Sequence, residues 1–244
     1  MTGFVFIHGA WLGGWTFDAV GQRLAAMGHV VDAPDLPGMN GEGSVDAPTL
    51  ADWSAFAVKR CEALRRSSGQ PVLLVGHSRG GIVLSRAAEA APDAMAGLVY
   101  LCAMMLPGGS VGSAWDAHLR ANPPLAALVS PTEDGEGTRL DREGVPELFA
   151  QNASKADAEM LAARVVTESD APRRGTLRLT PERYGKVPRT YIACTQDRVI
   201  PIARQRDMIA RQPGTNVIEI EADHSPFFSA PDMLARALDD LASK

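Results

Sequence analysis

The sequence reads Val-Leu-Leu-Val-Gly-His-Ser-Arg-Gly-Gly over residues 72–81, so that an apolar run passes directly into Gly-x-Ser-x-Gly. Residues 82–89 follow with a helix-forming pattern. A strand that turns into a helix so sharply that only glycine fits two positions either side of the serine is a nucleophile elbow, which exposes the serine Oγ above a sheet. The surroundings of the motif therefore predict Ser78 as a nucleophile.

The composition indicates one domain and no nucleic-acid partner. A chain of 244 residues suits a single α/β core. The 24 Lys and Arg residues against 29 Asp and Glu give a net charge of -5. The basic residues are scattered, so they form no stripe that could follow a phosphate backbone.

The cysteines and the hydropathy pattern bear on the compartment. Cys61, Cys102 and Cys194 lie far apart in apolar runs, which is typical of inert buried thiols. They predict a reducing compartment and no metal site. Residues 1–7 carry no basic leader, and no apolar run reaches membrane-spanning length. We therefore expect a cytoplasmic protein without a membrane partner.

Strand-like and helix-like segments alternate along most of the chain. Short apolar runs bounded by turns predict strands, at 4–7, 29–33, 72–75, 97–102, 190–194 and 216–220. Helical spacing predicts helices, at 17–27, 50–64, 82–89 and 202–211. This alternation predicts an α/β fold in which helices flank a mostly parallel central sheet and catalytic groups collect at the carboxyl ends of the strands.

Residues 103–186 interrupt this alternation. Pro and Gly break the segment repeatedly, part of it keeps helical periodicity, and no stretch of it reads as a sheet strand. We expect a helical lid, inserted into a single domain spanning residues 1–244, that walls a substrate pocket and excludes water. The candidate pocket residues are Trp11, Trp115, His118, Leu125, Leu128, Phe149 and Phe227. For those that lie in the lid, the alternative role is packing within the lid.

Two polar residues follow the last two predicted strands. Asp197 comes just after the strand at 190–194, and His224 comes just after the strand at 216–220. A serine hydroxyl is a poor nucleophile at neutral pH, and it needs a general base and a carboxylate that fixes the tautomer of that base. We therefore expect His224 to serve Ser78 as the base and Asp197 to orient His224.

Other residues near these positions have weaker cases. Asp35 also ends a strand and is a second candidate for the acid. Asp223 adjoins His224 in the chain, so its side chain should point elsewhere. His8 and His77 flank the two functional loops, and we expect them to shape those loops through hydrogen bonds.

A glycine-rich loop follows the first strand, with the sequence His-Gly-Ala-Trp-Leu-Gly-Gly-Trp over residues 8–15. The oxyanion of a tetrahedral intermediate needs two fixed donors, one of which is normally the amide after the nucleophile. That amide belongs to Arg79, and we expect Ala10 of the loop to supply the other. The Arg79 side chain either faces solvent or pairs with an acid, and its bulk could restrict substrates.

Four stretches, 4–15, 76–81, 191–201 and 219–231, resemble the α/β-hydrolase superfamily. The resemblance is to the branch that contains plant methylesterases, hydroxynitrile lyases and bacterial, pyrethroid-hydrolase-like esterases. The order Ser, Asp, His along the chain is also that of this superfamily. The resemblance implies the α/β-hydrolase fold, and a homodimer would not be surprising.

The chain departs from the lyases of that branch at three positions. The lyases carry threonine where this chain has Gly9, glutamate where it has His77, and lysine where it has Ser225. That lysine stabilises the departing cyanide, and Ser225 has no charge to do so. The resemblance thus implies ester hydrolysis rather than cyanohydrin cleavage.

We therefore expect a serine carboxylesterase that hydrolyses small to medium hydrophobic carboxylic esters through an acyl-enzyme. It should need neither a cofactor nor a metal. Two alternatives stay open: a hydroxynitrile lyase or C–C bond hydrolase that uses the same three residues, and a ligand receptor with little turnover.

Overall fold

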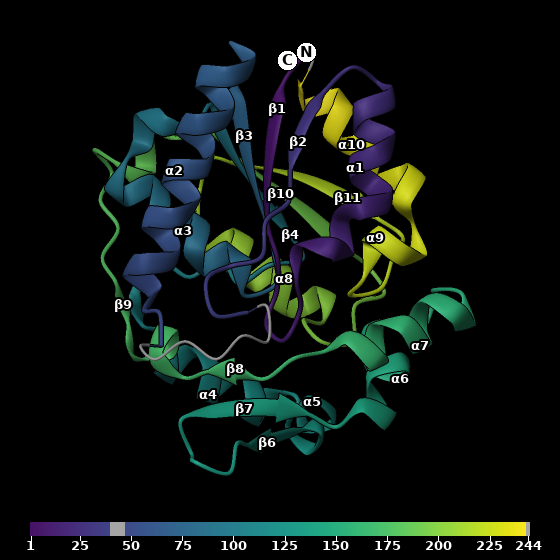
Figure 1. Ribbon diagram of the computed structural model, residues 1–244. Helices are drawn as coiled ribbons and strands as arrows, with labels where there is room; N and C mark the ends of the chain where they lie inside the picture. Colours follow the sequence, from purple (N-terminus) through teal and green to yellow (C-terminus); the bar gives the residue numbers. More distant parts are fainter. Residues whose placement is uncertain (40–46, 243–244) are drawn as a thin grey trace.

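The computed structural model describes residues 1–39 and 47–242. Within these residues the centre is a six-stranded sheet in which all neighbouring strands are parallel, in the order β11-β10-β4-β3-β1-β2. Its strands are β1 (Gly3–Ile7), β2 (Val30–Asp32), β3 (Val72–His77), β4 (Gly97–Leu101), β10 (Arg189–Cys194) and β11 (Thr215–Ile220) (Figure 1). The predicted parallel sheet is confirmed.

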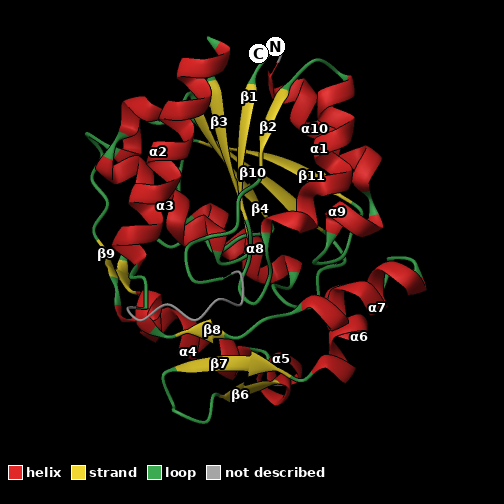
Figure 2. Cartoon of the chain, viewed as in Figure 1, coloured by secondary structure: helices red, strands yellow, loops and turns green. Residues whose placement is uncertain are grey.

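Helices flank this sheet on two sides (Figure 2). On one side α1 (Asp18–Ala26) packs against α10 (Pro231–Ala242), and on the other α2 (Leu50–Ser68) packs against α3 (Gly80–Ala90). Two further helices, α8 (Ile202–Ala210) and α9 (Pro226–Ser229), follow β10 and β11. Because the sheet is covered in this way, β1 and β4 are buried along their whole length, which explains their continuous apolar sequences.

Helix α2 carries two residues to the edge of the sheet where the strands end. It begins at a capping box in which Thr49 and Asp52 exchange hydrogen bonds, and it ends at Gly69, whose φ of 67° is the left-handed conformation that glycine adopts readily. Its first turn contains Leu50 and Trp53, and the Trp53 indole donates to the Pro37 carbonyl at 2.9 Å. The helix start therefore fixes an aromatic ring beside the functional loops.

Residues 103–186 connect β4 to β10 and form a cap beyond the carboxyl ends of the sheet strands (Figure 1). The cap helices are α4 (Val111–Ala121), α5 (Pro123–Leu128), α6 (Val145–Phe149) and α7 (Lys155–Arg164). The cap also holds short strands, β5 (Gly109–Ser110), β6 (Val129–Pro131), β7 (Gly137–Leu140), β8 (Glu168–Ser169) and β9 (Thr176–Leu177). The expectation that this segment contains no strand was wrong.

The reason lies in the length of these strands. Segments of two to four residues are too short to show an alternating pattern, so only their partners in space define them. β6 and β8 pair antiparallel with the two sides of β7, and β5 pairs with β9. The strand β8 matters most, because it carries Glu168 toward the centre of the molecule.

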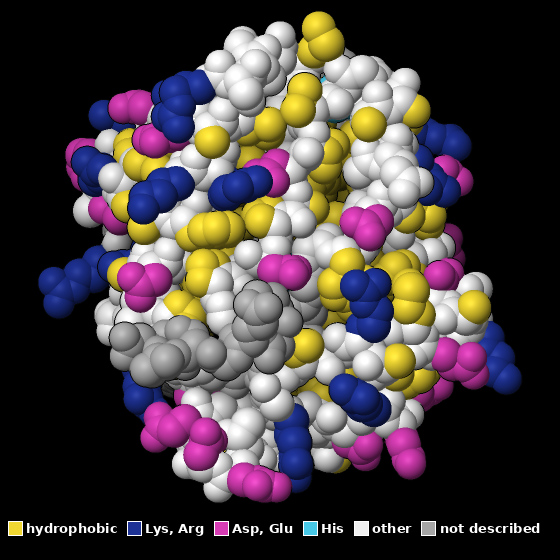
Figure 3. All heavy atoms as spheres, viewed as in Figure 1, with side chains coloured by type: hydrophobic (Ala, Val, Ile, Leu, Met, Phe, Trp, Pro, Cys, Tyr) yellow, Lys and Arg dark blue, Asp and Glu magenta, His cyan; other side chains and the backbone are white. Residues whose placement is uncertain are grey.

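Acidic and basic side chains are interspersed on the face of the molecule shown in Figure 3. No helix among residues 1–39 and 47–242 is both long enough and apolar enough to cross a membrane.

Candidate active site

Ser78 occupies a sharp turn between β3 and α3. Its φ of 52° is unusual for a residue with a side chain, as expected of a strained nucleophile elbow. A Cβ on Gly76 would lie 2.8 Å from the Gly80 carbonyl carbon, and a Cβ on Gly80 would lie 2.6 Å from the Ile7 carbonyl oxygen. The two glycines of the motif are therefore required by the packing of the turn.

The structure brings Ser78, His224 and Asp197 into one hydrogen-bonded chain. His224 Nε2 lies 3.0 Å from Ser78 Oγ, and His224 Nδ1 lies 2.8 Å from Asp197 Oδ2. The Asp197 carboxylate is itself fixed, because its Oδ1 accepts the backbone N–H groups of Val199 and Ile200 at 2.8 Å each. With both His224 and Asp197 buried, the geometry suits proton transfer from the serine to the imidazole.

The two other acids point away from His224. Asp35 accepts the Gly14 backbone N–H at 2.6 Å, so its carboxylate shapes the glycine-rich loop. Asp223 accepts the Ser225 N–H at 2.9 Å and the Asn152 N–H at 2.8 Å. Asp223 thus ties the loop after β11 to the cap, and Asp197 is the carboxylate that reaches His224.

Two histidines shape the loops, as expected. His8 Nε2 accepts the Leu36 N–H at 3.0 Å, which leaves the ring proton on Nδ1, 2.9 Å from the Gly9 carbonyl oxygen. Burial, together with the charge of Arg79, lowers the pKa of His8 to about 3, so its ring stays neutral. His77 Nε2 donates to the His224 carbonyl at 2.7 Å and holds the backbone of that residue.

Ala10 and Arg79, whose backbone N–H groups were expected to be the oxyanion donors, lie beside Ser78. Both residues line the same cavity as Ser78. Within the described residues neither N–H has a hydrogen-bond partner. Trp11, which follows Ala10, has a φ of 59°, and this left-handed conformation gives the loop its sharp bend.

The cavity beside Ser78 contains about 630 Å³ of empty space, counting its opening to solvent. Four of the predicted pocket residues line it: Trp11, Trp115, His118 and Leu125. His118 is 4% exposed, and its ring centroid lies 5.9 Å from that of Trp115. Burial lowers the pKa of His118 to about 4, so this ring is neutral at pH 7.

Three predicted pocket residues do not line the cavity, and these expectations were wrong. Phe149 packs behind the site, with its ring 5.5 Å from the His224 ring. Phe227 lies beneath His77, at 5.1 Å between ring centroids. Leu128 packs inside the cap against Gly144. Phe149 and Phe227 are buried and Leu128 is half-buried, and all three contribute to packing rather than to the cavity wall.

Sequence reasoning missed several residues that line the cavity: Leu50, Trp53, Ile82, Val83, Glu168 and Arg173. The α3 residues could have been found, because a helix that starts at the elbow presents its positions four and five residues after Ser78 to the same side. Glu168 could not, since its two-residue strand was not recognised, and neither could Arg173, which lies in the short 3-10 helix Ala171–Arg174 of the cap. The most important residue missed was Glu168, the acid that pairs with the Arg79 side chain, with its Oε2 3.3 Å from Arg79 Nε.

His77, Cys102 and His224 bring three ligand atoms of the kinds that bind metals within 4.8 Å of one another. The donor set does not suit a metal. Both His224 nitrogens already lie against Ser78 and Asp197, and His77 Nε2 donates to a carbonyl. Burial raises the pKa of the Cys102 thiol well above its usual value, which disfavours the thiolate that a metal needs.

Known proteins resemble this chain in sequence and in fold. The model of the alpha/beta hydrolase family matches residues 4–237. A pyrethroid hydrolase of Sphingobium wenxiniae is 34% identical, over 99% of this chain and 88% of its own, and Methylesterase 7 of Arabidopsis thaliana is 33% identical, over 99% and 96%. The crystal structure of a pyrethroid hydrolase from Sphingobium faniae superimposes with a TM-score of 0.84 at 31% identity, covering 99% of this chain and 97% of that one. This chain therefore belongs to the alpha/beta hydrolase family, in agreement with its sequence motifs.

Proposed function

We propose that this protein is a serine carboxylesterase that hydrolyses small to medium hydrophobic esters. The observation that carries the proposal is the chain of hydrogen bonds from Ser78 through His224 to Asp197, at 3.0 and 2.8 Å, at the wall of a largely apolar cavity. The cavity lies where alpha/beta sheets place their ligands, outside the carboxyl ends of the strands.

In the first half of the reaction Ser78 Oγ attacks the ester carbonyl carbon while His224 Nε2 takes the serine proton. Asp197 stabilises the imidazolium, and the amides of Ala10 and Arg79 donate to the oxyanion. The intermediate then collapses, the bond to the alcohol oxygen breaks, and His224 returns the proton to the leaving alkoxide. Water, deprotonated by His224, attacks the acyl-enzyme. The bond to Ser78 Oγ then breaks, His224 returns the proton to that oxygen, and the acid leaves.

Hydrophobic esters fit the side chains that surround Ser78. Apolar groups come from the sheet domain and from the cap, among them Ile82, Met104 and Leu125. The relatives named pyrethroid hydrolase and methylesterase are named for ester substrates. Both observations support an uncharged ester whose acyl or alcohol part packs against the cap.

A cytoplasmic location is part of the proposal. Cys61, Cys102 and Cys194 are all buried and free, which fits a reducing compartment.

The test is hydrolysis of p-nitrophenyl esters of increasing acyl length by the wild type and by Ser78→Ala. The matched control is Ser85→Ala, which removes a hydroxyl of α3 that bonds Gly81 and Tyr100 at 2.9 Å and does not line the cavity. We expect turnover by the wild type and by the control. In Ser78→Ala we expect kcat to fall by roughly a thousandfold or more. Undiminished turnover in Ser78→Ala would contradict the proposal. No turnover by folded wild type would contradict it as well and would favour a receptor.

A further inference from the structure

The peptide unit that joins Gly9 to Ala10 is held by two hydrogen bonds to its carbonyl oxygen. Its N–H belongs to Ala10, the proposed oxyanion donor, and its C=O belongs to Gly9. Arg79 Nη2 donates to that carbonyl oxygen at 3.0 Å, and His8 Nδ1 donates to it at 2.9 Å. Because a peptide unit is planar, two donors on the oxygen also fix the direction of the N–H at its other end.

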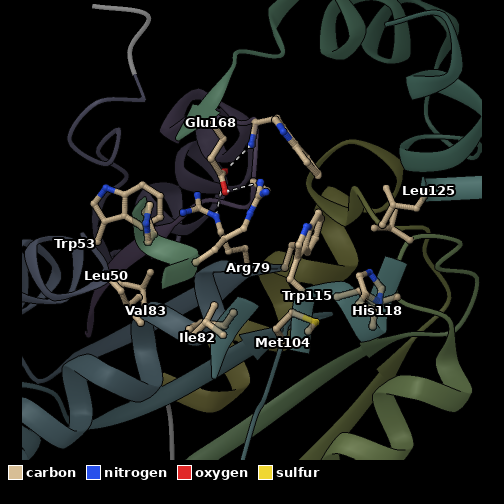
Figure 4. A pocket seen from close by; sticks show the side chains of 18 residues that line it. Leu50, Trp53, Arg79, Ile82, Val83, Met104, Trp115, His118, Leu125 and Glu168 are labelled. Atoms are coloured by element: carbon tan, nitrogen blue, oxygen red, sulfur yellow. Dashed lines mark hydrogen bonds and ion pairs between the residues drawn. The ribbon is translucent and has the colours of Figure 1, made fainter. Parts of the chain in front are cut away.

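The Arg79 guanidinium is in turn held in place by residues from α2 and the cap (Figure 4). It lies 4.1 Å from the centroid of the Trp53 ring, a cation–π contact. Its Nε is 3.3 Å from Oε2 of the fully buried Glu168. The same carboxylate oxygen accepts the Trp11 backbone N–H at 3.1 Å. Glu168 therefore binds both the arginine and the residue that follows Ala10.

Stability alone does not explain a charged side chain at this position. Arg79 is 8% exposed, and its Nη1 has no hydrogen-bond partner among the described residues. Buried ion pairs are often no more stabilising than apolar side chains of similar volume, and an unsatisfied buried N–H destabilises a fold. An apolar residue after Ser78 would avoid the unsatisfied N–H, but it would leave the buried Glu168 carboxylate without this partner. Besides the ion pair with Glu168 and the contact with Trp53, the guanidinium supplies a hydrogen bond to the Gly9 carbonyl, which neither of those contacts requires.

We propose that the Arg79 side chain, anchored by Glu168, positions and polarises the Gly9–Ala10 peptide so that the Ala10 N–H becomes a fixed and strengthened oxyanion donor. A hydrogen bond to the C=O of an amide strengthens the N–H of the same amide as a donor. The inference rests on the proposed ester hydrolysis. It makes Arg79 a positioning residue whose side chain acts through the loop, in addition to the donor role of its own backbone N–H.

Loss of the Arg79 side chain should affect kcat and KM differently. A donor aimed at the oxyanion acts when negative charge develops, so its support should affect the transition state more than the bound ester. Loss of the Arg79 guanidinium should therefore lower kcat and leave KM nearly unchanged. Removal of a whole oxyanion donor typically lowers kcat about 100- to 1000-fold, so loss of support for one donor should lower it about 10- to 100-fold.

The experiment compares Arg79→Met, Arg79→Lys and Glu168→Gln with the control Arg173→Met. Arg173 also lines the cavity, stacks on a tryptophan ring at 4.7 Å and pairs with Glu168 at 3.7 Å. It does not contact Gly9. The readouts are kcat and KM for one p-nitrophenyl ester, and the inhibition constants of an alkyl trifluoromethyl ketone and of the matching methyl ketone. The first ketone forms an oxyanion adduct with a serine far more readily than the second.

We expect Arg79→Met to lower kcat and to raise the inhibition constant of the trifluoromethyl ketone by the same factor. The inhibition constant of the methyl ketone should stay within about threefold of its wild-type value. Arg79→Lys, which keeps a charged donor, should recover part of the loss. Arg173→Met should change KM more than kcat. Equal weakening of both ketones, a loss in KM alone, or an Arg173→Met effect on kcat as large as that of Arg79→Met would overturn the inference.

Circular dichroism and the thermal midpoint first establish that each variant is folded. If Arg79→Met does not fold, the decision passes to Arg79→Lys and Glu168→Gln, which should each lower kcat several-fold without raising KM. Unchanged kcat in both would overturn the inference. Failure of the proposed esterase function would appear separately, as turnover that survives in Ser78→Ala.

Discussion

Replacing Asp197 with asparagine should remove most turnover and keep the fold, because the structure determines which way the new amide points. Asp197 Oδ1 accepts two backbone N–H groups at 2.8 Å, from Val199 and Ile200. Only a carbonyl oxygen can accept these bonds, so the asparagine Oδ1 takes this place. Its NH2 group then faces His224 Nδ1, where Asp197 Oδ2 now lies at 2.8 Å.

The NH2 group is a donor, so His224 Nδ1 must accept, and the proton of the neutral ring moves to Nε2. That nitrogen lies 3.0 Å from Ser78 Oγ and, once protonated, cannot take the serine proton. A triad histidine held in this wrong tautomer loses about 10,000-fold in kcat, which corresponds to about 5 kcal/mol of transition-state stabilisation.

The assay measures kcat on a p-nitrophenyl ester and the thermal midpoint for Asp197→Asn and for the control Asp223→Asn. Asp223 neighbours His224, but its oxygens accept bonds from Ser225, Asn152 and Ser229, so the control leaves the tautomer unchanged. Its kcat should stay within about tenfold of wild type. A folded Asp197→Asn that also stays within about tenfold, or a control that loses as much as Asp197→Asn, would refute the tautomer argument.

Three further predictions concern the loop, the reaction and the pH response. In Gly9→Ala the new Cβ would lie 2.8 Å from His77 Nδ1 and 3.0 Å from Ser78 Cβ, so the loop must shift, and kcat should fall by at least about tenfold; a kcat equal to wild type would show that the loop yields at no cost to catalysis. Incubation with mandelonitrile should release no cyanide above the buffer background, because Ser225 carries no charge to stabilise it; release that depends on Ser78 would establish lyase activity. Since the pKa of His118 is lowered to about 4 in the fold, its contribution to stability is complete above the unfolded pKa of about 6.5 and is lost as pH falls toward 4. The free energy of unfolding in urea should be measured from about pH 7 down to about pH 4. As the pH falls, it should decrease less in His118→Gln than in wild type, by up to about 1.4 kcal/mol per pH unit, and equal decreases would contradict the lowered pKa of His118.

Local sequence patterns predicted the sheet and the three residues of the hydrogen-bonded chain. Ser78 is marked by glycines that the tight turn requires, and Asp197 and His224 each follow a buried apolar strand of a parallel sheet. The carboxyl ends of such strands meet at one edge, so sequence order alone brings the three residues together.

The strands of the cap, and the cap side chains that reach the site, could not be predicted from the sequence. Its strands are two to four residues long and are defined by pairing, and its side chains reach the site through contacts distant in sequence. The partner of Arg79 is Glu168, on a two-residue strand that no periodic pattern reveals. Likewise, an apolar residue such as Phe149 or Phe227 has the same sequence signal whether it lines a cavity or packs behind it.

The most direct test of the account is to detect the acyl-enzyme on Ser78. The protein is mixed rapidly with p-nitrophenyl acetate, quenched in acid during the first turnovers, and its peptides are examined by mass spectrometry. The account predicts an early burst of p-nitrophenol and one acetyl group on the peptide that contains Ser78, both absent from Ser78→Ala. Turnover without an acetylated Ser78 at any quench time, or acetylation of another residue that persists in Ser78→Ala, would contradict it.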